Sequence, residues 1–191
     1  TFAIYGIDYL KPALVYVVIT VVLLLAFLII AYPLVIALGA KLDPFTFIRK
    51  IANVAVFGFS TSSSAATLPL NIKVCEEEFG VDESIASFVL PLGMTINMDG
   101  TAIYQCVATI FLATCCGMTL TLGQMVTIVV TATLASIGTA GTPGAGMIML
   151  AMVLEAMNIP VDMIMIIYGI DRLFDMGRTC LNITGDKTED R

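Results

Sequence analysis

The amino-acid sequence predicts an all-α integral membrane protein that combines transmembrane helices with re-entrant helical hairpins. Of its 191 residues, 59% are hydrophobic and 13% are charged, whereas soluble domains average about 45–50% and about 25%. Residues 13–38 form an uncharged run that exceeds the roughly 20 residues needed to cross a bilayer. Two later apolar stretches are each interrupted by a short polar segment. Such segments are tolerated at membrane depth only inside protein or beside water, so both stretches are interpreted as hairpins.

The first two elements in chain order are a transmembrane helix over residues 13–38 and a re-entrant hairpin over residues 44–78. The hairpin has two apolar limbs on either side of the polar tip STSSSAAT at 60–67. Apolar segments of about 10–15 residues are more often re-entrant than spanning. We therefore expect this segment to enter and leave the membrane on the same side.

Residues 84–116 are expected to form a helix that is broken near its centre. The segment GMTINMDGT at 93–101 places Asn97 and Asp99 inside an otherwise apolar run and contains Gly100. Glycine destabilises a helix interior, so we expect the break at Gly100. Unwound backbone at this depth points to a cavity lined by protein.

A second re-entrant hairpin is expected over residues 122–157, followed by a substrate-binding helix over residues 161–186. The hairpin tip GTAGTPG contains three glycines and a proline, which cannot continue a helix cheaply. The order of elements therefore repeats: a hairpin followed by a broken helix in the first half, and a hairpin followed by a polar helix in the second half. Paired discontinuous segments predict an inverted repeat within a single transport domain, with the binding site where the halves meet.

The last helix carries a regular row of polar residues in GIDRLFDMGRTCLNITGD, namely Asp171, Asp175, Arg178, Asn182 and Asp186. These positions lie within about 60° of one another on a helix, so they share one face. A charge at the bilayer centre costs about 2.5 kcal/mol or more, so these residues must pair, face a cavity or bind a ligand. A ladder of internal salt bridges that only ties helices together remains open.

Arg178 and Asp175 are suited to the two charges of an acidic amino acid. A guanidinium binds a carboxylate bidentately, and a carboxylate binds an ammonium group. The serines at 62–64 can hold the second carboxylate through free backbone N–H groups at a helix start. The alternative, which is compatible with the first, is that a serine merely caps the following helix.

Asp99 and Asp186 each adjoin a glycine that is expected to interrupt the helix and free carbonyl oxygens. Carboxylate and carbonyl oxygens select hard cations. Transporter sodium sites are built in this way, so Na⁺ is the expected coupling ion. A proton relay through the same aspartates is the competing interpretation.

Composition excludes several other classes of protein. A net charge of −6 and the lack of a basic run argue against nucleic acid as a partner. The chain has no histidine, which excludes a Ser–His nucleophile pair and a His-ligated metal. The five cysteines are expected to pack as small hydrophobes. A carrier, and not an enzyme, is the leading functional class. An ion channel is the second candidate. A membrane aspartyl hydrolase is the third, but the second catalytic aspartate motif that it would need is missing.

Four segments resemble the signatures of the glutamate/aspartate:sodium symporters, the dicarboxylate/amino acid:cation symporter family. They are TSSSAATLP, LPLGMTINMDGTAIYQ, ASIGTAGTPGAG and DRLFDMGRTCLNITGD. The resemblance implies a multi-pass protein of the cell membrane that couples Na⁺ entry to uptake of L-aspartate or L-glutamate. A proton-coupled dicarboxylate carrier is the alternative within this resemblance.

The resemblance also implies an elevator-type transport core in contact with membrane lipid, a homotrimer when full length, and no cofactor besides Na⁺ as coupling ion. Residues 13–38 would be the sixth helix, so the chain is expected to lack the N-terminal scaffold, and the second hairpin would be the extracellular gate. The implied substrate residues are Ser63, Ser64, Thr101, Gly141, Asp175, Arg178, Thr179 and Asn182. The implied sodium residues are Gly93, Thr95, Asn97, Met98, Asp99, Ser136, Ile137, Thr139, Asn182 and Asp186.

Three positions depart from the family pattern. Members that carry acidic amino acids have an extra arginine at a position equivalent to Ser62 or Met176, and Arg172 is the candidate to replace it. Gln105 stands where animal members have the glutamate used for proton cotransport, which disfavours proton and K⁺ coupling. Arg178 itself separates the chain from neutral amino acid carriers, and Asp175 separates it from C4-dicarboxylate carriers.

Overall fold

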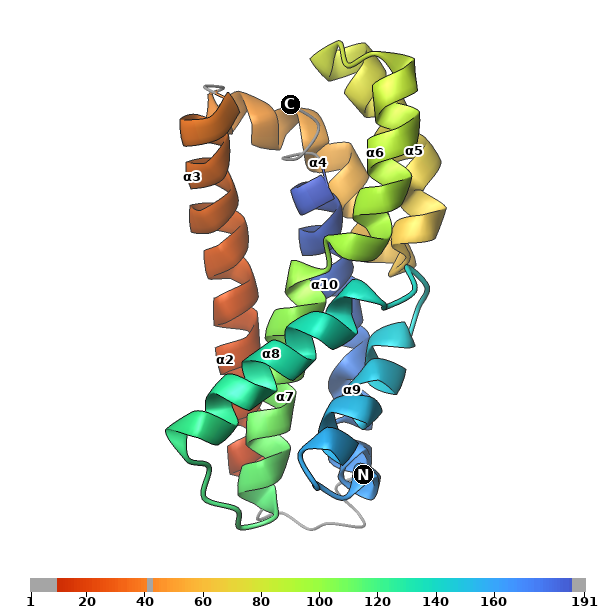
Figure 1. Cartoon of the computed structure of the whole chain (residues 1–191). Coiled ribbons are helices and arrows are strands. Elements are labelled where there is room, and N and C mark those ends of the chain that lie inside the picture. The colour runs from red at the N-terminus through yellow and green to blue at the C-terminus, as the bar shows by residue number, and fades with distance from the viewer. Residues whose placement is uncertain (1–9, 41–42, 187–191) are drawn as a thin grey trace.

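The computed structural model describes residues 10–40 and 43–186, and every regular element in these ranges is a helix (Figure 1). In chain order the elements are α2 (Leu10–Ala26), η2 (Phe27–Ala31), α3 (Tyr32–Val35), η3 (Ile36–Ala40), α4 (Pro44–Thr61), α5 (Ser64–Phe79), α6 (Glu83–Ile96), α7 (Asp99–Cys115), α8 (Leu122–Ile137), α9 (Ala145–Ala156), η4 (Val161–Ile166) and α10 (Tyr168–Asp186). The all-α prediction is confirmed for these ranges.

The first four elements form one long helix along one side of the molecule (Figure 1). The stretches η2 and η3 are π-helical and flank the short α3, which contains Pro33. Proline lacks an N–H, and its ring clashes with the carbonyl four residues earlier in a regular helix. Wider π-helical turns accommodate such a disruption. Within the described ranges, Lys11–Leu38 is the one helix both long and apolar enough to cross a membrane.

Helices α4 and α5 form the first helix pair, and residues 62–63 between them form the first tip. Ser62 ends α4 in the left-handed conformation with φ 52°. Ser63 is extended, and its hydroxyl accepts the Ala66 N–H at 3.1 Å, which caps the start of α5. Two residues therefore suffice to turn the chain, and α5 packs back along α4.

Helices α6 and α7 are the halves of the broken helix, and the break lies at Asn97 and Met98. Asn97 has φ −87° and ψ 78°, and Met98 has φ −115° and ψ 46°. The expectation that Gly100 breaks the helix is wrong, because Gly100 lies in the first turn of α7. A Cβ atom at Gly100 would lie 2.9 Å from the Arg178 carbonyl oxygen, so this glycine serves close packing against α10.

Helices α8 and α9 form the second helix pair, and residues 138–144 between them form the second tip. A capping box of Thr121 and Gln124 begins α8, which satisfies two N–H groups at the helix start. Gly144 precedes α9 with φ 80°, a conformation that favours glycine. The pair packs against α7 (Figure 1).

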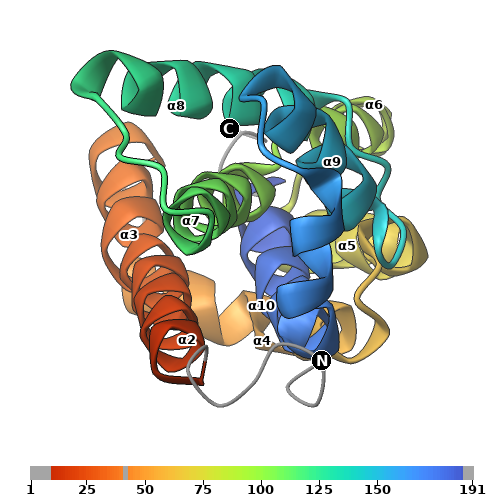
Figure 2. The ribbon, with the colours of Figure 1, turned by 90° about the horizontal axis from the view of Figure 1, so that it is seen from below.

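Helix α10 lies at the centre of the molecule, flanked by α2, α4 and α7 (Figure 2). It also contacts α5 and α6. The helix continues through Gly185, so the expected interruption beside Asp186 is wrong. A Cβ atom at Gly185 would clash with the Tyr32 hydroxyl and the Asn97 amide nitrogen. As at Gly100, glycine here permits a close approach rather than a break.

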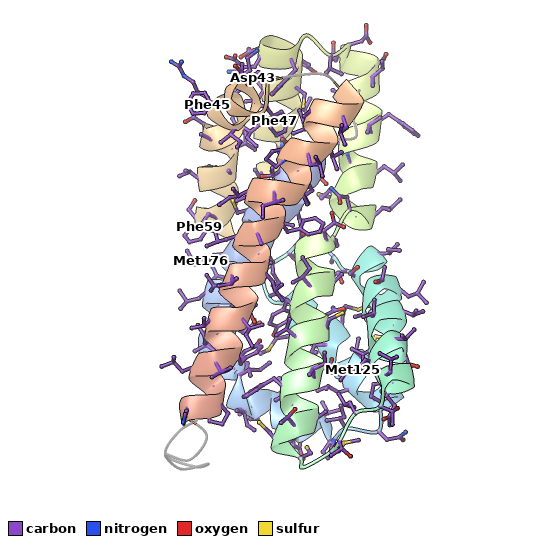
Figure 3. All side chains as sticks on the ribbon, turned by 90° about the vertical axis from the view of Figure 1, so that its left-hand side faces the viewer. Asp43, Phe45, Phe47, Phe59, Met125 and Met176 are labelled. Carbon is purple, nitrogen blue, oxygen red and sulfur yellow. The ribbon has the colours of Figure 1, made fainter. Side chains whose placement is uncertain are left out.

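Large apolar side chains cover much of the outer surface. Phe45 on α4 is 76% exposed, and Leu38 at the end of the first helix is 74% exposed. Phe45 and Phe59 project from the outer edge of α4, whereas Phe47 turns inward (Figure 3). Soluble proteins rarely expose such extended apolar surfaces. Among the cysteines, Cys75 is buried in the core and the others are partly buried, all as free thiols.

Candidate functional site

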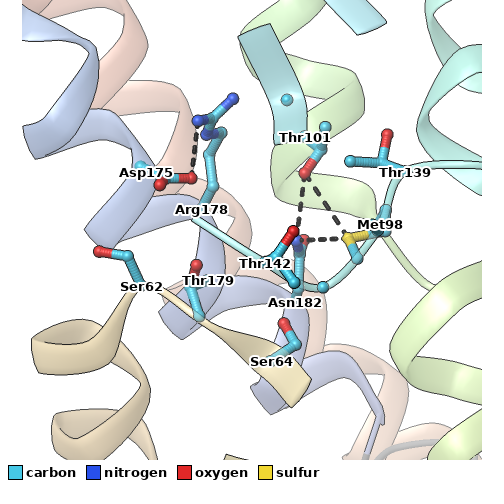
Figure 4. Close-up of a pocket in the computed structure, with 13 residues that line it drawn as sticks. Ser62, Ser64, Met98, Thr101, Thr139, Thr142, Asp175, Arg178, Thr179 and Asn182 are labelled. Carbon is cyan, nitrogen blue, oxygen red and sulfur yellow. Dashed lines mark hydrogen bonds and ion pairs between the residues drawn. The ribbon is translucent and has the colours of Figure 1, made fainter. Parts of the chain in front are cut away.

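A small polar cavity lies where both tips meet α7 and α10 (Figure 4). Its volume is about 20 Å³, room for about one water molecule. The residues that line it are Ser62, Ser64, Met98, Thr101, Thr139, Ala140, Gly141, Thr142, Gly146, Asp175, Arg178, Thr179 and Asn182. Every residue predicted to bind substrate is in this set except Ser63, which lies beside it.

Arg178 is 1% exposed and is held by carboxylates of its own helix. Its Nη2 lies 2.8 Å from Asp175 Oδ1 and 3.5 Å from Asp171 Oδ1, and its guanidinium carbon lies 4.0 Å from the centre of the Tyr104 ring. Its Nε and Nη1 have no hydrogen-bond partner among residues 10–40 and 43–186. Buried donors normally have partners, so the N–H groups of these two nitrogens are unsatisfied donors that an anion could use if the cavity enlarged.

Gly146, in the first turn of α9, makes room for this guanidinium. A Cβ atom at this position would clash with Arg178 Nη1 and would lie 2.9 Å from Cζ. The backbone of α9 therefore packs directly against the charged group. Glycine at this position therefore keeps the start of α9 in contact with Arg178 while the cavity is closed.

Asp175 connects α10 to the second tip. Its Oδ1 pairs with Arg178, while its Oδ2 accepts the Gly144 N–H at 3.0 Å. Arg172 lies 3.8 Å from Asp175 Oδ2, but its side chain is 60% exposed and does not line the cavity. The internal salt-bridge ladder left open by the sequence is thus present. Its central pair also faces the cavity, so the two interpretations of the polar row are compatible.

The two tips are bonded to each other. The Ser63 hydroxyl donates to the Gly141 carbonyl oxygen at 2.8 Å, and the Ala65 N–H donates to the same oxygen at 3.0 Å. Ser63 also caps α5, so a serine of the tip does cap the following helix, but it is Ser63 and not Ser64, the expected serine directly before AATLPL. These contacts close the cavity on the side of the tips.

Asn182 joins the cavity to the broken helix. Its Oδ1 accepts the Gly100 N–H at 2.8 Å, and its Nδ2 lies 3.2 Å from Thr101 Oγ1 and 3.0 Å from Met98 Sδ. All these partners lie at the break or in the first turn of α7. A ligand that moves Asn182 would therefore also move the start of α7.

A second cluster of oxygen atoms lies one turn further along α10. The Asn97 Nδ2 donates to Asp186 Oδ1 at 3.2 Å and to the Asn182 carbonyl oxygen at 3.5 Å. Gly93 faces the same carboxylate, because a Cβ atom there would lie 3.3 Å from Asp186 Oδ1. The amide nitrogen thus occupies the space between two oxygen acceptors. If it turned away, those oxygens would suit a hard cation such as Na⁺.

Asp99, in the first turn of α7, borders a separate groove and bonds to the first helix. The Tyr32 hydroxyl donates to Asp99 Oδ2 at 3.1 Å. The groove is lined by Phe27, Ile96, Asn97, Met98, Asp99, Ala102, Ile103, Thr133, Ser136 and Ile137. Asn97 and Met98 are thus within reach of both α10 and this groove. No group of three or more acidic or cysteine side chains converges as a metal site within residues 10–40 and 43–186.

The remaining predicted sodium residues are not gathered into one group. The Thr95 hydroxyl donates to the Leu92 carbonyl of its own helix at 2.9 Å, and Thr95 lines neither the cavity nor the groove. Ser136 and Ile137 line the groove, whereas Thr139 lines the cavity.

Helix ends give the two regions opposite polarity. The starts of α5 and α9 lie at the cavity, as the Ala65 and Gly144 N–H contacts demonstrate. The end of α6 lies at the oxygen cluster, where the Gly93 carbonyl accepts the Asn97 N–H at 2.7 Å. Helix starts favour anions and helix ends favour cations. The N–H groups at the cavity therefore suit a carboxylate, and the carbonyl and carboxylate oxygens of the cluster suit a cation.

Ser62 lines the cavity, as the serine run of the first tip led us to expect. Gly146 and Tyr32, in contrast, were not predicted from the sequence. Gly146 resembled any other glycine of the second hairpin. Tyr32 lay in an apolar run that was interpreted only as a membrane span, so no local pattern distinguished it.

Comparison with known proteins gives consistent matches along nearly the whole chain. The family model described as the sodium:dicarboxylate symporter family matches residues 1–188. A provisionally named sodium-dependent excitatory amino acid transporter, glt-4, of Caenorhabditis elegans is 46% identical over 170 residues, which are 88% of this chain and 34% of that protein. An excitatory amino acid transporter of Onchocerca volvulus is 44% identical over 158 residues, which are 83% of this chain and 32% of that protein. Neutral amino acid transporter B(0) of Homo sapiens is also 44% identical over 158 residues, here 83% of this chain and 29% of that protein. The chain thus spans about a third of the length of these relatives.

Proposed function

The chain belongs to the sodium:dicarboxylate symporter family, and on that basis we propose that the full-length protein carries L-aspartate or L-glutamate into the cell together with Na⁺. The family is one of membrane transporters rather than enzymes. The observation that carries the proposal is Arg178, a fully buried guanidinium at a polar cavity with two nitrogens, Nε and Nη1, that no described residue accepts from.

An acidic amino acid has the charges needed to replace the existing ion pair. In the proposal its side-chain carboxylate takes the place of Asp175 at Arg178, and its ammonium group takes the place of Arg178 at Asp175. Each buried charge then keeps a partner throughout, which avoids the cost of about 3–5 kcal/mol for leaving one unpaired. The second carboxylate would lie at the first tip, near Ser64 and the start of α5.

The cavity must enlarge before this exchange can occur, because its present volume is about 20 Å³, close to that of one water molecule. The bonds of Gly141 to Ser63 and Ala65 and that of Gly144 to Asp175 hold the second tip in place. In the proposal the second helix pair opens as a gate when these bonds break. Both helix pairs are then re-entrant hairpins of an elevator-type core, and the full-length protein is a homotrimer in the cell membrane.

Sodium coupling is assigned to the oxygen atoms around Asn97, Asp99 and Asp186. Asn182 belongs to both regions, since its side chain faces the cavity and its carbonyl oxygen faces Asn97. Cation binding that turns the Asn97 amide would therefore reposition Asn182 and favour substrate binding. This shared residue supplies a physical route for coupling between two sites.

The test is ligand binding to the full-length protein by calorimetry in Na⁺ and in choline. L-Aspartate and L-glutamate should bind in Na⁺ and should bind much more weakly in choline. Arg178→Ala should lose about 100-fold in affinity for both acids, whereas the matched control Arg172→Ala, an exposed cation of the same helix, should change it little. Acid binding that survives in Arg178→Ala would overturn the assignment of this residue.

A neutral amino acid is the second candidate substrate. Neutral amino acid transporter B(0) is as similar to this chain as the excitatory transporter of Onchocerca volvulus, and Asp175 neutralises Arg178 in the structure. Alanine and serine therefore belong in the same binding series. Tighter binding of these ligands than of L-aspartate would favour the second candidate, and tighter binding of succinate than of L-aspartate would favour a dicarboxylate carrier.

A further inference from the structure

The first helix contributes one side chain to the region assigned to the cation. Tyr32 is 4% exposed, and its hydroxyl donates to Asp99 Oδ2 at 3.1 Å across 67 positions of sequence. Its ring stands edge-on to Phe27, with ring centres 5.3 Å apart and planes at 86°. Phe27 itself lines the groove beside Asp99. Burial and this ring contact together fix the direction of the hydroxyl.

The same hydroxyl also lies against α10. A Cβ atom at Gly185 would clash with both the Tyr32 hydroxyl and the Asn97 amide nitrogen. Asn97 in turn donates to Asp186. Tyr32 is therefore in contact with the surroundings of Asp99 and of Asp186 at once, from a helix that carries no other residue predicted to bind an ion.

The local form of the first helix explains how Tyr32 reaches this position. Tyr32 is the first residue of α3, between the π-helical η2 and η3, and Pro33 follows it. A π-helical turn changes the direction in which later side chains point, and such turns recur at functional sites. A regular helix through this proline would be disrupted instead.

From this geometry we propose that Tyr32 is a positioning residue for Na⁺ at Asp99. By holding Oδ2, the hydroxyl fixes the orientation of the carboxylate and leaves Oδ1 for the cation. The inference rests on the proposed Na⁺-coupled function. It adds that the first helix helps to set the affinity for Na⁺ without touching the amino acid.

The experiment is a Na⁺ titration of L-aspartate binding to the full-length protein, comparing wild type with Tyr32→Phe, which removes only the hydroxyl. The Na⁺ concentration at half-maximal binding should rise about tenfold, as expected for one hydrogen bond to a charged group. The affinity for L-aspartate at saturating Na⁺ should not change. Tyr16→Phe is the matched control, because Tyr16 is also buried on the first helix and its ring stacks on Phe111; it should leave the Na⁺ dependence as in wild type.

A second variant, Phe27→Leu, keeps the hydroxyl but removes the ring that orients it. It should raise the half-maximal Na⁺ concentration in the same direction and by less than Tyr32→Phe. If Tyr32→Phe shifts the Na⁺ dependence no more than Tyr16→Phe, or weakens L-aspartate binding at saturating Na⁺ as well, the inference is wrong. Binding of L-aspartate to wild type that ignores Na⁺ would instead overturn the proposed coupling itself.

Discussion

The two ends of the polar face of α10 differ in the charge that they suit. At the end containing Asp171, Asp175 and Arg178, opposite charges pair with each other and the starts of α5 and α9 point inward. At the end containing Asn182 and Asp186, oxygen atoms gather around the Asn97 amide at the end of α6. In the proposed function, one helix face would serve an anion at one end and a cation at the other.

The helix termini around α10 differ between the two ends, as do its own side chains. Helix starts carry partial positive charge, and helix ends carry partial negative charge. The N–H groups at the starts of α5 and α9 reach the cavity, beside the ends of α4 and α8, while the break at Asn97 places the end of α6 and the start of α7 at the oxygen cluster. If this account is right, mutations at the two ends should affect separate quantities.

The largest effect is expected from Asp175→Ala at the substrate end. The variant removes the proposed partner of the ammonium group and leaves Arg178 with Asp171 as its remaining partner. Affinity for L-aspartate should fall about 100-fold or more, because truncating one partner of a buried charge pair costs about 2–5 kcal/mol. Calorimetry should show a smaller loss for succinate, which has no ammonium group. Equal losses for both ligands would contradict the role given to Asp175.

Asp186→Asn should act at the other end. It keeps the shape of the side chain and removes the negative charge, so the Na⁺ concentration for half-maximal L-aspartate binding should rise about 30-fold. Affinity at saturating Na⁺ should stay close to that of wild type. The control is Asp162→Asn, since Asp162 is an exposed carboxylate in η4. If Asp186→Asn changed substrate selectivity, the claim that the two ends of the helix face act separately would be wrong.

Gly146→Ala should produce an intermediate loss at the substrate end. The added methyl group clashes with Arg178 Nη1, and overpacking of this kind costs about 1–3 kcal/mol. Affinity for L-aspartate should fall about tenfold, with the Na⁺ dependence unchanged. Gly138→Ala, in the same tip, is the control, because the closest contact of the added methyl group would be the Met149 methyl group at 3.9 Å. Equal behaviour of the two variants would argue against a role for the space at Gly146.

The smallest effect is expected from Ser63→Ala in the first tip. The variant removes both the cap on α5 and the bond to the Gly141 carbonyl. Loss of a helix cap costs about 1 kcal/mol, so thermal unfolding in detergent should begin at a lower temperature. L-Aspartate affinity should change by only a few fold. Ser60→Ala, an exposed serine of α4 that bonds to its own helix, should leave both quantities unchanged.

Features that depend on spacing within one helix were predicted well from the sequence. The shared face of Asp171, Asp175, Arg178, Asn182 and Asp186 follows from the helix period, and these residues are buried together. The tip serines and tip glycines were predicted because turns and helix starts require particular residue types. Nearly all the predicted substrate residues line one cavity.

Features that depend on contact between helices were predicted less well. Gly100 and Gly185 looked like helix breakers, but each allows a close approach that only the assembled helices reveal. The sequence did not identify Tyr32 as a site residue, because an aromatic residue in an apolar run has the same local pattern whether it faces lipid or Asp99. The pairing of Arg178 with Asp175, in contrast, lies within α10 and was one of the alternatives left open by the sequence.

The most direct test of two coupled sites on one helix face is reciprocal binding. Calorimetry on the full-length protein should measure the affinity for Na⁺ with and without saturating L-aspartate, and the affinity for L-aspartate with and without saturating Na⁺. Linkage requires each ligand to strengthen the other by the same factor, typically about 5–150-fold for coupled sites. The account predicts such a factor for wild type. Affinities that are independent of each other would contradict it.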